Sequence, residues 1–194
     1  MADQSAQLTL AQDQSADELL SRDPFALLVG MLLDQQFPME RAFAGPRLIA
    51  DRMGVDRLDP AAVAEAAPEG FVALLTGPPA VHRFPGAMAG RIQALAAHVV
   101  DRYGGDAERL WTEATDGAEL LRRLRALPGF GEQKATIFLA LLGKQLGVRP
   151  AGWREAAGPY GEEGSRRSVA DVTDAASLAE VRAYKQEAKR AAKG

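Results

Sequence analysis

Apolar residues recur at helical spacing along most of this chain, and the alternating pattern typical of strands is nearly absent. Asp23 and Pro24 are typical of a helix start, as N-cap and first helical residue. One helix face then carries Phe25, Leu28, Val29, Leu32, Leu33 and Gln36. The periodicity therefore predicts an all-α protein of about nine helices packed on one another.

Glycine, proline and capping residues divide the chain into the expected elements. Further helices are expected at residues 38–53, from residue 60, and at 68–75, 88–103, 106–114, 117–127, 132–146 and 174–193. The 194 residues are enough for one large domain or two small ones. We expect a polar leader at residues 1–22 and a helical domain at 23–148. Residues 149–194 are expected to form a glycine-rich loop and a basic helix on that same domain.

Charge and cysteine content exclude several kinds of site. The chain has no cysteine, which excludes disulfides, a thiol nucleophile and cysteine-bound zinc or iron–sulfur clusters, so no cofactor is expected. The net charge is -3, so any nucleic-acid site must be a local basic patch. No apolar run approaches about 20 residues, and the acidic N-terminus lacks a signal peptide's basic-then-apolar order. We expect a cytoplasmic protein that does not contact membranes.

The segment Leu-Pro-Gly-Phe-Gly at residues 127–131 lies between two expected helices. Gly129 and Gly131 would let the turn adopt positive φ and approach a ligand closely. The segment from residue 119 to 147 contains five Lys or Arg residues but only two Asp or Glu residues, so it is locally basic. The free N–H groups and dipole at the next helix start favour an anion, and a phosphate backbone fits. The alternative is a plain helical hairpin with a glycine cap.

Three segments together resemble the helix-hairpin-helix (HhH-GPD) superfamily of base-excision DNA glycosylases. Residues 127–131, followed by Lys-Ala at 134–135, resemble its hairpin. Residues 25–38 look like the family's early helix, which ends in a glutamine. Residues 90–105 are similar to the helix two elements before the hairpin. The matches occur in the family's order and span roughly residues 20–148.

This resemblance implies two helical lobes with a helix-hairpin-helix motif and an interlobe cleft. Gln36 would sit at the cleft, near the gap left by a flipped nucleotide; its alternative role is a helix-end glutamine with a satisfied amide. The expected partner is double-stranded DNA, bound by a monomer that joins the nucleoid. The expected DNA-binding residues are Gln36, Arg125, Gly129, Phe130, Gly131, Gln133, Lys134, Trp153 and Tyr160.

Two positions depart from the family pattern. Gln133 occupies the slot of the nucleophilic lysine of bifunctional members, and Lys134 lies about 100° further round the helix. We therefore expect no Schiff-base lyase activity, and we expect Lys134 to contact phosphate or solvent. The family's catalytic aspartate is also missing, because residues 147–154 contain no carboxylate. Substitutes for it are Asp34, Glu155, Glu162, Glu163 and Asp171, with His82 as a further candidate.

The glycine-rich loop that follows carries Trp153 and Tyr160, whose rings either stack on a flipped base or fill the core. The resemblance, with Gln133 in the nucleophile slot, implies a monofunctional DNA N-glycosylase that removes a damaged base. The alternative is a non-catalytic DNA-binding protein that has lost the aspartate. The sequence does not specify which lesion is removed.

Overall fold

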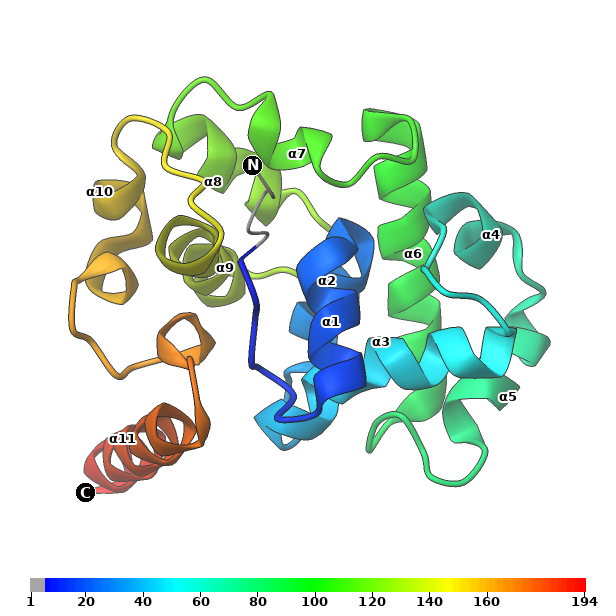
Figure 1. Ribbon diagram of the computed structural model, residues 1–194, viewed down its shortest axis with the longest axis horizontal. Helices are drawn as coiled ribbons and strands as arrows, with labels where there is room; N and C mark the ends of the chain where they lie inside the picture. The colour runs from blue at the N-terminus through cyan, green and yellow to red at the C-terminus, as the bar shows by residue number, and fades with distance from the viewer. Residues whose placement is uncertain (1–5) are drawn as a thin grey trace.

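The fold, described for residues 6–194 by a computed structural model, consists of helices and connecting loops, with no strand in that range (Figure 1). The expected all-α class is confirmed. None of these helices is long and apolar enough to cross a membrane. The α-helices are α1 (Gln14–Arg22), α2 (Pro24–Leu33), α3 (Met39–Met53), α4 (Pro60–Glu65), α5 (Pro68–Thr76), α6 (Pro85–Tyr103), α7 (Arg109–Thr112), α8 (Gly117–Arg125), α9 (Glu132–Gln145), α10 (Trp153–Ala157) and α11 (Ala175–Lys193). Two short 3-10 helices, η1 (Gly158–Gly161) and η2 (Val169–Asp171), precede α11.

The helices fall into two groups by their packing. In the first group, α2 packs on α3, α1 on both of them, and α4 and α5 on α6. In the second, α8, α9 and α10 pack on one another, while η1 and η2 pack on α9. The second group lies on one side of the molecule in Figure 1, and α11 extends from its edge. The two groups bring α2 and the start of α9 near each other, although about 100 residues separate them in sequence.

Local capping explains why α2 begins where the sequence predicts. The buried Asp23 carboxylate accepts the N–H groups of Phe25 and Ala26, at 3.1 and 3.2 Å. It also accepts the N–H of Leu58 at 2.8 Å, which ties α2 to the loop before α4. Pro24 occupies the first helical position, where a missing N–H costs nothing.

The end of α2 differs from the expectation. The helix stops at Leu33, three residues before Gln36, which lies in the following loop with φ of 53°. Gln36 is exposed and does not continue the buried stripe. The predicted helix was too long because Gln36 has the same 3–4-residue spacing as the apolar residues of α2. The chain, however, has already left the helix after Leu33.

Two helices arise in segments where none was expected. Within the leader, α1 is capped by Asp13 and buries Leu19 and Leu20, and the residues before it bury Leu8 and Leu10. The glycine-rich stretch after α9 contains the short α10. Both helices are short, and tertiary packing rather than helix propensity stabilises segments of this length.

Candidate active site

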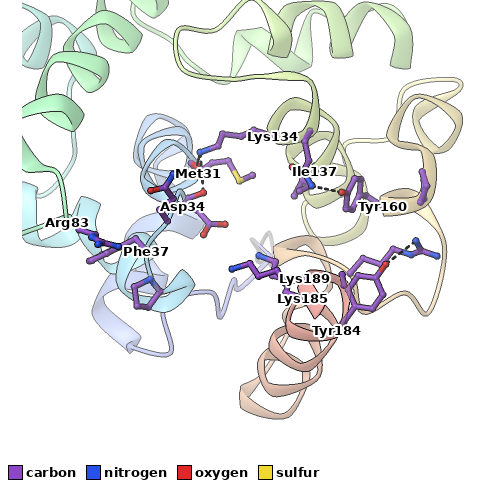
Figure 2. A pocket seen from close by; sticks show the side chains of 16 residues that line it. Met31, Asp34, Phe37, Arg83, Lys134, Ile137, Tyr160, Tyr184, Lys185 and Lys189 are labelled. Atoms are coloured by element: carbon purple, nitrogen blue, oxygen red, sulfur yellow. Dashed lines mark hydrogen bonds between the residues drawn. The ribbon is translucent and has the colours of Figure 1, made fainter. Parts of the chain in front are cut away.

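A pocket of about 970 Å³ lies where four parts of the fold meet (Figure 2). Its walls are the loop after α2, the first turn of α9, the η1 segment and one face of α11, and Arg83 adds a further side chain. The residues of the expected site that line it are Asp34, Gln36, Gln133, Lys134 and Tyr160. The fold therefore gathers in one cavity residues that are far apart in sequence.

The loop after α2 is held by the buried His82. Phe84 donates its backbone N–H to Nδ1 of His82 at 3.0 Å, so Nδ1 acts as the acceptor. Nε2 then carries the proton and donates it to the carbonyl of Gln35, also at 3.0 Å. Burial lowers the pKa of His82, which favours this neutral form. His82 does not line the pocket, so its role is to position the loop that carries Asp34 and Gln36.

Asp34 is the one expected carboxylate that the fold places in the pocket. It caps the C-terminus of α2 and points its carboxyl group into the cavity (Figure 2). Burial raises the pKa of Asp34, while the positive charges of Lys185 and Lys134 oppose that rise. A carboxyl group with a raised pKa, set in a cavity, is typical of a general acid or base.

Lys134, expected to contact phosphate or solvent, lines the pocket wall and also binds the end of α2. Its Nζ reaches across to the end of α2 and donates to the carbonyls of Met31 and Leu32, at 2.7 and 3.0 Å. A third contact, at 3.3 Å, goes to the carbonyl of Asp34. An ammonium group at a helix C-terminus is stabilised by the last carbonyls and by the helix dipole. Burial nevertheless lowers the pKa of Lys134 to about 8.

The remaining candidate carboxylates lie elsewhere. Asp171 is buried, but Lys144 binds it at 2.6 Å, and Ser165 and the backbone of Arg167 donate to its other oxygen. It therefore braces the chain before α11. The other three candidates, Glu155, Glu162 and Glu163, are exposed outside the pocket, and Glu162 lies 3.6 Å from Arg167. None of these four carboxylates can serve the pocket in this arrangement.

Two aromatic candidates belong to the core instead of the site. The Trp153 side chain is buried against Gly143, where even a methyl group would lie 2.3 Å from the indole ring. The Phe130 ring is also buried and meets Phe138 edge-on, with 6.0 Å between ring centroids. Neither side chain is available to stack on a base. Tyr160 does line the pocket, and its hydroxyl accepts a hydrogen bond from Gln133 at 2.9 Å.

The turn between α8 and α9 uses its two glycines differently. Gly129 has φ of 82°, in the left-handed region, and a Cβ there would lie 2.3 Å from a methyl group of Leu32. Gly131 has φ of -80° and open space around it, so the expected need for positive φ is wrong at this residue. Arg125 forms an ion pair with Glu132, which offsets part of the basic character expected for the turn.

The pocket is rich in positive charge. Its lining includes the cations Arg83, Lys134, Arg167, Lys185 and Lys189 and the single carboxylate Asp34. This excess contrasts with the chain's net charge of -3. The sequence analysis did not name Arg83 or Phe37 as site residues: Arg83 lies in a loop outside the motifs, and Phe37 lies in the segment 25–38 without being singled out there.

No protein-family model matches the chain, and no curated protein matches it. The functional argument therefore comes from the pocket and from the residues that line it.

Proposed function

We propose that this protein is a monofunctional DNA N-glycosylase that binds double-stranded DNA as a monomer and turns a damaged nucleotide into the pocket. The observation that carries the proposal is the meeting of Asp34, Gln36 and Lys134 in one cation-rich cavity. The resemblance of three segments to HhH-GPD glycosylases supports the same assignment. The excess of cations suits a DNA backbone, whose phosphates supply nearly all of the free energy of non-specific binding.

In this proposal, Asp34 takes the part of the missing family aspartate. Cleavage of an N-glycosidic bond builds positive charge on the sugar, and a nearby carboxylate stabilises that charge. The same carboxylate can accept the proton of the attacking water. Gln36 is exposed on the pocket rim with a left-handed backbone, a conformation that is costly for a non-glycine residue and common at functional sites. Its amide is suited to the space left by the flipped nucleotide.

A glycosylase screen tests the proposal. The protein is incubated with duplexes that each carry one damaged base, and alkali then cleaves any abasic site that forms. We expect strand cleavage with at least one lesion, and we expect Asp34→Asn to abolish it while duplex affinity stays within about twofold. A Glu163→Gln variant serves as control, because Glu163 is exposed outside the pocket and should not affect cleavage.

The second candidate function is non-catalytic DNA binding. It is favoured by the absence of any carboxylate in residues 147–154, where the family carries its aspartate. Duplex binding without cleavage of any lesion in the panel would support it. Cleavage that persists in Asp34→Asn would instead show that Asp34 is not the acid.

A further inference from the structure

One face of α11 forms a wall of the pocket. Tyr184, Lys185, Ala188 and Lys189 line the cavity, and their spacing places them on one side of the helix. Figure 2 shows Lys185 and Lys189 extending from α11 toward the segment of Asp34 and Phe37, across the pocket from Lys134. The two lysines are four residues apart, which separates them by about 6 Å along the helix axis.

These two lysines are not used in ion pairs that hold the fold together. No carboxylate of residues 6–194 lies within 4.0 Å of either ammonium group. Other cations of this region do have such partners, since Arg182 binds Glu40 and Arg166 binds Glu180. The structural ion pairs therefore secure α11, while Lys185 and Lys189 keep their charge directed at the cavity.

The C-terminal part of α11 also has little packing of its own. The buried residues of this helix are Ser177, Leu178 and Val181, all in its first half. A helix segment that is polar on all sides and exposed to solvent needs stabilising contacts, because it buries no apolar face of its own. A polyanion bound along the pocket face would supply them.

We propose that the pocket face of α11, with Lys185 and Lys189, binds the phosphates of the DNA strand that enters the pocket. This inference rests on the proposed DNA binding. It gives the protein a second contact with the DNA phosphates, in addition to the one expected at the α8–α9 turn. Tyr160, Tyr184 and Phe37 line the same cavity, so it presents aromatic rings as well as cations. A nucleic-acid strand offers both phosphates and base faces to such a wall.

Salt-dependent binding of DNA tests the inference. A fluorescein-labelled duplex with a tetrahydrofuran abasic-site analogue is titrated at several NaCl concentrations, and its Kd is measured by anisotropy. Loss of both lysines in Lys185→Gln/Lys189→Gln should reduce the slope of log K against log salt by about 2. Affinity at low salt should fall roughly tenfold or more. The charge-conserving variant Lys185→Arg/Lys189→Arg should retain the wild-type slope.

The matched control is Arg190→Gln/Lys193→Gln, which removes the same charge from exposed positions of α11 that do not line the pocket. We expect its slope to change by less than about 0.5. Equal losses in both double variants would overturn the inference in favour of a general charge effect, as would an unchanged slope in Lys185→Gln/Lys189→Gln. If polyglutamate displaced the labelled duplex as readily as unlabelled DNA does, the assignment of a DNA strand to the α11 face would be wrong. Wild-type protein that binds no duplex at low salt would overturn the proposed function and this inference together.

Discussion

Asp34 combines a position near the end of α2 with a carboxyl group inside a cation-rich pocket. Its nearest charges act in opposite directions on its pKa, since Lys185 and Lys134 lower it and Glu40 raises it. Burial has the largest effect, and it raises the pKa. A raised pKa means that the folded chain holds the proton more tightly than the unfolded chain does. Asp34 in its charged form therefore destabilises the fold.

The consequence at this residue is a gain of stability on neutralisation. We expect Asp34→Asn to raise the Tm at pH 7, because the amide has nearly the same shape and carries no charge to desolvate. The gain should shrink as the pH falls toward 3.8, the ordinary pKa of the group, where the wild-type carboxyl group is itself protonated. Thermal unfolding followed by circular dichroism at several pH values measures both effects. A lower Tm at pH 7 would show that the carboxylate makes a stabilising contact.

Among the elements, the turn between α8 and α9 sets how closely α9 approaches α2. Gly129 has left-handed φ and lies against Leu32 of α2, so its missing side chain permits the contact. Gly131 caps α9 with ordinary φ and faces open space. The two glycines lie in the same turn but differ in backbone conformation and surroundings, so each can serve as the control for a substitution at the other.

We expect Gly129→Ala to destabilise the protein by about 1–3 kcal/mol, because an alanine strains the left-handed backbone and its methyl group overlaps Leu32. Gly131→Ala should change the free energy of unfolding by no more than about 0.5 kcal/mol. Urea unfolding of both variants measures the difference. Equal destabilisation would contradict the distinct roles of the two glycines.

At the scale of the whole molecule, Lys134 joins the two groups of helices. It belongs to α9 of the second group, and its ammonium group donates to the last carbonyls of α2 in the first. Arg182 and Glu40 form a further link, between α11 and α3. Residues from α9 and α11 and from the loop after α2 line the pocket, so its shape depends on how the two groups are held together.

The pKa of Lys134, which burial lowers, predicts a pH dependence of stability. The folded chain releases the Lys134 proton near pH 8, whereas the unfolded chain holds it up to about the ordinary value of 10.5. Within this window the unfolded state binds more protons, so rising pH stabilises the fold. The free energy of unfolding of wild type, relative to Lys134→Met, should therefore increase from about pH 8 to about pH 10.5. Urea unfolding at several pH values measures it, and a difference that is flat or decreasing would contradict the lowered pKa.

Interactions between near neighbours made the helices predictable from sequence. The N-caps at Asp23, Asp59 and Asp116 bind N–H groups two or three residues ahead, so a short stretch of sequence determines where α2, α4 and α8 begin. Two helices were missed for different reasons. The α10 helix has only five residues in a glycine-rich stretch, and α1, although capped by Asp13, lies in a segment interpreted as a polar leader.

The site depended on the tertiary structure. Sequence reasoning named Asp34, Gln36, Lys134 and Tyr160, but it could not choose Asp34 among five carboxylates or foresee Lys134 at the end of α2. It also could not tell that Trp153 fills the core while Tyr160 faces the pocket. Spacing along one helix determines which side chains share its face, but only the packing of α2, α9 and α11 determines which faces meet. That packing follows from the burial of the whole core, which no local segment encodes.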